Sequence, residues 1–528
     1  MKSKTISLLF TLAVSTLHAE INMPEVFSDN MVLQRRMPVK LWGSADANAK
    51  VDAEFAGQKK STTADSKGKW VLYLDSLKAS TKPREIQILE NGKLAKTIKN
   101  VLVGEVWIAS GQSNMEMPVG ALRHKVDISG LENPLVRCFK QKTFSISNTP
   151  REHSEEGVWV SAAPKNENPA FDKQDNGWGG KSDDIPYRHL SATGYFFANT
   201  LANNLKVPVA ILYAAKGGTS MCAWIPEFAM QRLPYLKSRF EKFEKDLAAD
   251  DYKKRRAVYD EKIAKHKEAV AKAKAEGKTP PKLAWRDTLV PTPETPWSIF
   301  NSPACDYNSK IHPIATFTAR GVIWYQGEAN VSNYTGPFEE QYKVLVDSWR
   351  EIWDNPKMPF ICVQLTSFGT NADWPTTRVH QLNVANSLND SYIINTIDLG
   401  EKDDIHPTDK KYVGERLGKM ALNKVYGKKI DVVYPEFASA NYMDNGVEVK
   451  FTTKAKLVGK GEPRGFEIKI NGKWIDAKPE LSGKDTVFIA STSGKPEGVR
   501  YLWKSWASPE AWLFNKSNLP AYSFKDEK

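Results

Sequence analysis

The chain has 528 residues, a formal net charge of +12, and 41% hydrophobic against 26% charged residues. Its length exceeds that of one ordinary domain, and its composition is that of a globular protein. Half of the excess charge lies in residues 237–282, with 15 Lys and Arg against 9 Asp and Glu. No basic stripe is interleaved with aromatic residues, which argues against nucleic acid as a partner. The body of the chain has no apolar run of about 18 residues, so we expect no membrane insertion.

The N-terminus has the pattern of a secretory signal peptide. Lys2 and Lys4 precede an apolar run at 6–14, and Leu17-His18-Ala19 offers a cleavage site after Ala19. We therefore expect residues 1–19 to be removed from a periplasmic or secreted protein. A buried N-terminal helix is the alternative.

Residues 20–100 predict a small antiparallel β-sandwich domain. Short runs of alternating apolar and polar residues, such as 39–43, 51–55 and 70–74, are broken by Gly, Asn and Asp.

A second unit begins with an apolar, β-prone run at 101–109, which stops at Gly111 and is followed directly by Gln112, Ser113 and Asn114. This pattern predicts a buried strand that ends in a tight turn. In open α/β sheets ligands bind at the carboxyl ends of strands, so Ser113 would lie where chemistry usually occurs. A helix beginning at about Asn114 would favour negative charge beside the Ser113 hydroxyl. The alternative is that Ser113 only caps this helix.

The pattern through 101–428 predicts strands that alternate with helices, and therefore a parallel sheet with helices on its faces. The expected strands after the first are 135–139, 207–215, 317–325, 360–365 and 392–398, and the expected helices are 192–204, 334–353 and 376–388. A long polar loop is expected at 141–189. A charged helical hairpin, 234–277, forms an insertion at about 230–285; we interpret it as solvated structure, with a contact surface for a polymer or partner as the alternative. Residues 429–528 return to short alternating runs and predict a C-terminal β-domain.

Four of the expected strands end in polar loops, at 111–114, 217–220, 326–330 and 403–406. A serine nucleophile needs a base within hydrogen-bond reach, and that base needs an orienting carboxylate. These loops supply Ser113 as nucleophile, His406 as base and Asp403 as carboxylate. Asp404 competes for the orienting role, and Glu328 is a further candidate whose alternative role is to anchor the loops.

Such a site also needs hydrogen-bond donors for the oxyanion. The backbone amides of Ser113 and of Gly217 or Gly218 are candidates, together with the side-chain amide of Gln326 or Asn330. Gln112 is a candidate for a supporting role beside the nucleophile.

These motifs resemble the sialate O-acetylesterase-type family of SGNH hydrolases, a branch of the GDSL-like esterases. The similarity runs through nearly the whole mature chain, in the segments 27–34, 104–107, 110–115, 217–219, 307–308, 324–330, 404–407, 499–501 and 519–521. It implies a flavodoxin-like three-layer α/β/α catalytic domain at 101–428 with β-sandwich-like domains at 20–100 and 429–528.

The resemblance also implies a carbohydrate O-acetylesterase that needs no cofactor or metal and acts on an acetylated oligo- or polysaccharide, either sialic acids or plant polysaccharides. Two alternatives are a carbohydrate-binding protein without turnover and an esterase for non-sugar esters. The sequence indicates neither the oligomeric state nor which glycan is bound.

Three features of the chain depart from this pattern or add to it. In the third conserved motif of SGNH hydrolases, Asn follows Gly by two residues, whereas Asn330 follows Gly327 by three. Gln326 is therefore slightly favoured as the side-chain donor to the oxyanion. Cys222 and Cys305 lie beside two of the motifs, and a disulfide between them stays open. Aromatic faces stack on sugar rings, and four tryptophans in loops near the strand ends are candidates for this, although most tryptophans belong to cores: Trp178, Trp224, Trp297 and Trp374.

Overall fold

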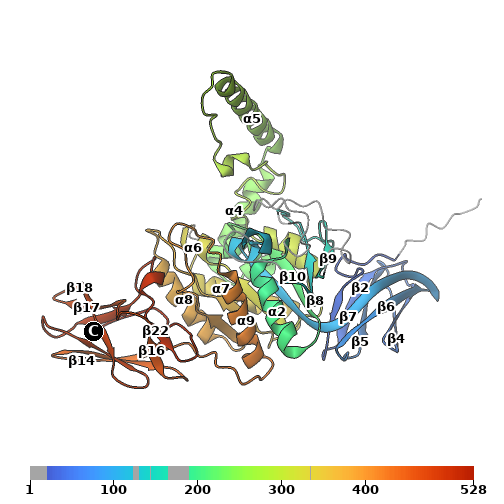
Figure 1. The fold of residues 1–528 in the computed structure, drawn as a ribbon. Helices are drawn as coiled ribbons and strands as arrows, with labels where there is room; N and C mark the ends of the chain where they lie inside the picture. The colour runs from blue at the N-terminus through green and yellow to red at the C-terminus, as the bar shows by residue number, and fades with distance from the viewer. Residues whose placement is uncertain (1–20, 123–129, 143, 164–188, 333–334) are drawn as a thin grey trace, which may run out of the picture.

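The computed structural model of the chain describes residues 21–122, 130–142, 144–163, 189–332 and 335–528 (Figure 1). The predicted signal peptide at 1–19, residues 143 and 164–188 of the predicted loop at 141–189, and Trp178 lie outside the described residues. Residues 158–162 of that predicted loop form a strand, so the loop prediction is wrong there.

A mixed α/β core with a largely parallel central sheet lies in the middle of the chain, as predicted. Its strands are β7 (Lys93–Gly111), β8 (Asn133–Lys140), β9 (Val158–Ala162), β10 (Val209–Ala215), β11 (Gly321–Tyr325), β12 (Phe360–Val363) and β13 (Ser391–Ile394). They are ordered β13-β12-β11-β7-β10-β8-β9, and only the edge strand β9 pairs antiparallel within this order. Strand β7 is therefore central, and the strands that follow it in the chain lie on both of its sides.

The order of the six parallel strands differs from the one that the resemblance implies. Counted along the chain it is 2-3-1-4-5-6, because β10 pairs with both β7 and β8 and so separates them. A flavodoxin-like sheet has the order 2-1-3-4-5. Either order leaves the first strand with neighbours on both sides, and this is where such sheets bind ligands.

Helices pack on both faces of this sheet. On one face, Trp107 of β7 packs against Phe197 of α2 (Ala192–Leu205), with ring centroids 5.1 Å apart, and donates a hydrogen bond of 2.9 Å to Tyr426, just after α9 (Lys410–Lys424). Trp324 is in register with Ser110, three residues beyond Trp107, and so faces the other way. The Trp324 ring lies 6.0 Å from the ring of Trp349 in α7 (Phe338–Ile352). Helix α7 also packs against α8 (Trp374–Ser387).

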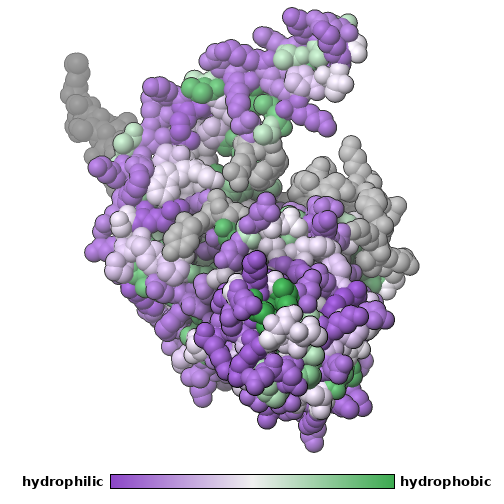
Figure 2. Space-filling view, turned by 90° about the vertical axis from the view of Figure 1, so that its left-hand side faces the viewer, coloured by the Kyte–Doolittle hydropathy of each residue, from purple (hydrophilic) through white to green (hydrophobic). Residues whose placement is uncertain are grey.

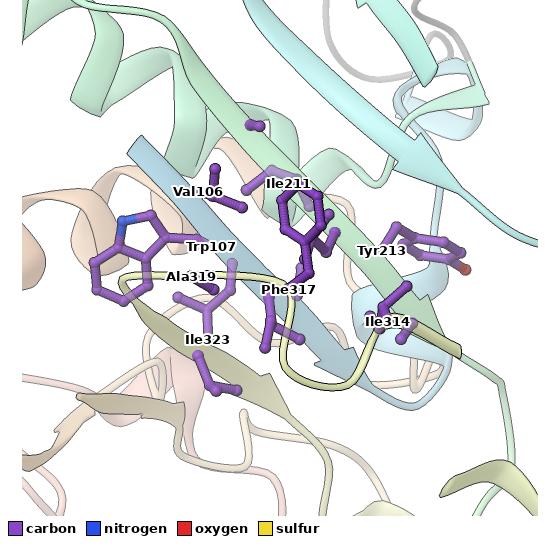
Figure 3. Close-up of a cluster of buried hydrophobic side chains, with 14 of the residues drawn as sticks. Val106, Trp107, Ile211, Tyr213, Ile314, Phe317, Ala319 and Ile323 are labelled. Atoms are coloured by element: carbon purple, nitrogen blue, oxygen red, sulfur yellow. The ribbon is translucent and has the colours of Figure 1, made fainter. Parts of the chain in front are cut away.

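Apolar side chains fill the layer around β7. Val106 and Trp107 lie beside Ile211 of β10 and Ile323 of β11, and Phe317 reaches in from the segment before β11 (Figure 3). All of them are buried. The strand that leads to Ser113 is thus buried in the core.

Six strands precede the central ones, and four of them belong to the same sheet: β1 (Val32–Gln34), β3 (Lys50–Phe55), β4 (Gln58–Thr63) and β6 (Ser80–Glu90). The other two, β2 (Val39–Ser44) and β5 (Lys69–Leu74), pair with each other in a separate two-stranded sheet. The 19-residue β7 pairs with β6 in its first half, and with β10 and β11 in its second. The predicted boundary at residues 100 and 101 therefore falls within one strand.

The C-terminal region is built from antiparallel strands around a core of its own. One sheet contains β14 (Glu436–Met443), β15 (Gly446–Thr452), β20 (Thr486–Ala490) and β19 (Pro479–Leu481); a second contains β18 (Lys473–Ala477), β17 (Phe466–Ile470), β21 (Gly498–Tyr501) and β23 (Phe524–Glu527); and a two-stranded ladder joins β16 (Leu457–Gly459) to β22 (Leu513–Asn515). The rings of Phe437 and Phe524 stack with their centroids 4.4 Å apart between the two larger sheets.

The predicted charged hairpin is present as α4 (Pro234–Ala248) and α5 (Tyr252–Ala275). Helix α5 has no buried residue and extends away from the body of the molecule (Figure 1). The lobe at the top of Figure 2 is mostly hydrophilic, in keeping with a solvated insertion. In the part of the chain that the structure describes, no helix combines the length and the apolar character needed to cross a membrane.

One buried carboxylate ties the N-terminal strands to the central sheet. Glu105 of β7 is fully buried and accepts hydrogen bonds from Arg35 (2.6 Å), Gln34 (2.9 Å) and Arg320 (3.0 Å). Burial alone would raise the pKa of the Glu105 carboxyl, but Arg320 and Arg35 outweigh it and hold this pKa below its usual value.

We predict that Glu105→Gln lowers the free energy of unfolding by about 3 kcal/mol, because two mostly buried guanidinium groups lose their anionic partner. A lowered carboxyl pKa stabilises the folded state above pH 4.5 and loses its effect as the pH falls through the folded value. The difference in free energy of unfolding between wild type and variant, measured by denaturant titration, should therefore become smaller at acid pH. As a control, Glu54→Gln, which breaks an exposed pair with Lys59, should change stability little. Equal unfolding curves for wild type and Glu105→Gln at pH 7 would contradict this account.

Candidate active site

The turn that carries Ser113, the candidate nucleophile, follows directly after β7. Gly111 has φ +135°, and a Cβ there would lie 2.1 Å from the carbonyl oxygen of Tyr325 on the neighbouring strand, so the position requires glycine. Helix α1 (Ser113–Glu116) begins two residues later. Its N-cap is Gln112, which makes no side-chain capping bond. Ser113 lies inside the helix, so the interpretation of Ser113 as a cap is wrong.

Ser113 and His406 meet although 293 residues separate them. The Nε2 atom of His406 lies 2.8 Å from the Ser113 hydroxyl oxygen. His406 comes from the loop between β13 and α9, and Ser113 from the end of β7, both at the carboxyl edge of the sheet. This hydrogen bond joins the hydroxyl to a base that can take its proton.

A carboxylate of the same loop lies near the other ring nitrogen. The Asp404 carboxylate accepts a hydrogen bond of 2.8 Å from the His406 backbone amide, and its Oδ1 lies 3.7 Å from His406 Nδ1. This distance fits an ion pair that forms when the ring becomes protonated. The Asp403 and Asp404 side chains are both exposed. The structure thus brings the second candidate, Asp404, to the ring, and the orienting role of Asp403 stays a prediction.

The surroundings of His406 favour the neutral imidazole. Burial lowers the pKa of His406 below its usual value of 6.5, and the nearby Lys410 ammonium lowers it further, whereas Asp404 acts in the opposite direction. A neutral ring near pH 7 is the form that acts as a general base.

The loop at 216–220 lies close to Ser113. A Cβ on Gly217 would lie 3.2 Å from the Cβ of Ser113, which explains the glycine. However, the Gly217 amide donates a hydrogen bond of 2.5 Å to the Glu116 carboxylate. Gly217 therefore provides room beside Ser113 rather than an available donor. Gly218 has φ +74° and packs under Phe300.

The two candidate side-chain donors contact each other. The Nε2 atom of Gln326 donates to the carbonyl oxygen of Thr219 (3.2 Å) and to Oδ1 of Asn330 (2.6 Å), which uses both of its N–H groups. The Nδ2 atom of Asn330 makes one long hydrogen bond, 3.4 Å, to Thr335 within the described residues. The geometry therefore favours Asn330 over Gln326 as the donor to an oxyanion.

Side chains next to the nucleophile bind the loops together. Gln112 accepts a hydrogen bond of 3.1 Å from the Ala329 amide, in agreement with the supporting role predicted for it. Asn114 donates to the Glu328 carboxylate and, at 3.0 Å, to the carbonyl oxygen of Ile405. Glu328 is fully buried, and this burial raises its pKa. Through Asn114 it anchors the loops, and its candidacy for orienting His406 stays a prediction.

Two of the candidate tryptophans are core residues. Trp224 and Trp374 are 0% and 2% exposed, so neither can stack on a sugar, and the prediction for both is not supported. They donate hydrogen bonds to Thr219 (3.0 Å) and to the carbonyl oxygen of Thr366 (2.7 Å). Trp297 is partly exposed and packs on α4, with its ring 5.4 Å from that of Phe243.

The four cysteines are buried and free, so Cys222 and Cys305 form no disulfide. No group of three or more His, Cys, Asp or Glu side chains suited to a metal ion occurs among the residues that the structure describes.

Sequence reasoning did not single out three residues of this site: Asn114, Glu116 and Lys410. Asn114 and Glu116 carry a signal, because both lie in the first turn after Ser113. The sequence gives no signal for Lys410, because two adjacent lysines look alike in it. The structure distinguishes them: Lys410 is fully buried and Lys411 is exposed.

The chain is similar to known carbohydrate esterases. Residues 295–426 match the model of the SASA family, described as carbohydrate esterase, sialic acid-specific acetylesterase. The sialate O-acetylesterases of Rattus norvegicus and Homo sapiens are both 24% identical to this chain, over 524 and 522 residues; each match covers 91% of this chain and 89% or 87% of the relative. The crystal structure of a carbohydrate acetylesterase from Xanthomonas citri aligns with a TM-score of 0.75 and 25% identity, covering 96% of this chain and all of that one. The predicted family resemblance is confirmed.

The lowered pKa of His406 generates a prediction. A fluorophosphonate should label Ser113 at a rate that rises with pH through an apparent pKa below 6.5, because only the unprotonated imidazole can take the serine proton. His406→Gln should abolish labelling, whereas His266→Gln, in the solvated helix α5, should leave the profile unchanged. An apparent pKa at or above 6.5 would count against the described surroundings of His406.

Proposed function

We propose that this chain is a carbohydrate O-acetylesterase that works as a serine hydrolase, with Ser113 as nucleophile. The contact of 2.8 Å between Ser113 and His406 is the observation that carries the proposal. The family match and the sialate and carbohydrate acetylesterases among its relatives support an acetyl ester on a saccharide as the substrate.

The reaction follows from the placement of the two side chains. His406 Nε2 takes the Ser113 proton as Oγ attacks the acetyl carbonyl carbon and forms a tetrahedral oxyanion. When the bond from this carbon to the sugar oxygen breaks, the imidazolium returns the proton to the leaving hydroxyl. Water then attacks the acetyl-Ser113 ester with His406 again as base, and acetate leaves as Ser113 regains its proton.

Nearby groups stabilise the charges that develop in this reaction. The proposed oxyanion donors are the Ser113 backbone amide and the second N–H of Asn330, which has no acceptor among the described residues. The Gly217 amide is bound to Glu116. Asp404 stabilises the imidazolium from the Nδ1 side.

We also propose that the protein reaches the periplasm or the outside of the cell through the signal peptide at 1–19, on the basis of its charged start and apolar core. The C-terminal β-region is proposed as a separate module attached to the catalytic unit, and the N-terminal β-region as a domain that shares β7 with it.

Replacement of the nucleophile tests the proposed function. Acetate release should be measured on acetylated xylan, xyloglucan, pectin and O-acetylated sialic acid, and Ser113→Ala should lose roughly 10⁴-fold or more in kcat, as in other serine hydrolases. Ser110→Ala is a matched control, because Ser110 is buried three residues earlier and its hydroxyl has no hydrogen-bond partner among the described residues. A folded Ser113→Ala protein with wild-type turnover would refute the proposal.

The choice between the two neighbouring carboxylates can be tested with a matched pair of variants. Asp404→Asn should lower kcat/KM on the order of 10-fold or more, because the imidazolium loses its nearest counter-charge, although exposure screens part of the effect. It should also move the acid limb of the pH profile to lower pH, since Asp404 raises the His406 pKa. Asp403→Asn, with the same charge change, should have the smaller effect. The reverse ranking would assign the orienting role to Asp403.

A further inference from the structure

Lys410 is a buried cation behind the catalytic pair that the proposed reaction does not use directly. It is the first residue of α9 and is fully buried. Its ammonium donates hydrogen bonds of 2.7 Å to Asn114 Oδ1 and of 2.6 Å to the carbonyl oxygen of Pro407. It also lies 5.4 Å from the centroid of the Tyr325 ring, at the end of the strand next to β7.

The partners of this ammonium lie on both sides of His406. Lys410 binds the carbonyl of Pro407, and Asn114, which receives the other Lys410 bond, donates to the carbonyl of Ile405. Residues 405 and 407 flank the base, and Asn114 follows the nucleophile directly. The two hydrogen bonds therefore fix the backbone of His406 relative to the turn that carries Ser113.

Several carboxylates lie near the buried Lys410 ammonium and partly offset the cost of its burial. Burial lowers its pKa to about 7, while the Glu328, Asp404, Glu401 and Asp409 carboxylates act against this change. Of these, Glu328 is buried and reaches Lys410 through Asn114, which contacts both. Burying a charge is costly, and an apolar residue at the start of a helix would avoid that cost.

The same positive charge acts on His406. Lys410 disfavours the imidazolium, as burial also does. Below pH 6.5, where His406 takes up its proton, a lysine with a pKa of about 7 carries its charge. The electrostatic effect is therefore present in the pH range in which it matters.

We propose that Lys410 is a positioning residue for the reaction of Ser113: through Asn114 and the Pro407 carbonyl it holds His406 against the nucleophile, and its charge keeps the imidazole unprotonated. This inference rests on the proposed function for the reaction that Ser113 performs. The contacts of Lys410 do not depend on that function.

The test compares Lys410→Met with Lys411→Met, which removes the adjacent, exposed lysine of the same helix. Fluorophosphonate labelling of Ser113 and acetate release are both followed as a function of pH. In Lys410→Met the acid limb of the rate–pH profile should move to higher pH, because the charge that lowers the His406 pKa is lost. The plateau rate should fall on the order of 100-fold, the loss expected when a catalytic group shifts by about 1 Å. Lys411→Met should match wild type in both readouts.

Lys410→Gln is the second variant in case the methionine variant does not fold. Its amide can still donate to Asn114 while the charge is lost, so the acid limb should move upward with a smaller fall in the plateau. A purely structural lysine would lower the melting temperature without moving the acid limb, and that result in either folded variant would overturn the proposal. Labelling needs no acetyl ester, so a wild-type protein that labels at Ser113 but releases no acetate would refute the substrate assignment and leave this test intact.

Discussion

The hydrogen bond between Ser113 and His406 depends on the end of one strand. β7 stops at Gly111 with a backbone conformation that only glycine adopts easily, against the main chain of β11. The turn then presents Ser113 where the strands on both sides of β7 also end, and the chain returns to this edge after β13 with His406. Parallel strands place their carboxyl ends at one edge, so residues far apart in sequence become neighbours there.

Polar contacts between loops, rather than apolar packing, set the details of the site. Gln112 binds the loop after β11, Asn114 reaches both Glu328 and the His406 loop, and Glu116 binds the loop after β10. Behind the last of these loops, the fully buried pair of Lys216 and Asp306 is held at 2.9 Å. Buried polar groups of this kind add little net stability, but the hydrogen bonds that they form favour one arrangement of the loops.

Much of this arrangement follows from sequence patterns. The apolar run before Gly111 and the three other polar strand ends predict the sheet edge and its two main residues, because alternation of strands and helices implies parallel strands. Sequence patterns could not divide the chain at β7, since one long strand pairs with two regions. They could not rank Asp403 and Asp404, because the direction of each side chain depends on the local turn. Nor could they separate Asn330 from Gln326, because this depends on the hydrogen bond that Gln326 donates to Asn330. They also could not recognise Trp224, Trp374 and Lys410 as buried.

The central claim is that Ser113 and His406 form one reactive pair. A crystal structure of the protein after reaction with a phosphonate ester would test it most directly. The account predicts phosphorus bonded to the Ser113 hydroxyl oxygen, with His406 facing that oxygen and the Asn330 side chain facing the phosphoryl oxygen. Phosphorus on another residue, or a His406 ring turned away from the adduct, would contradict it.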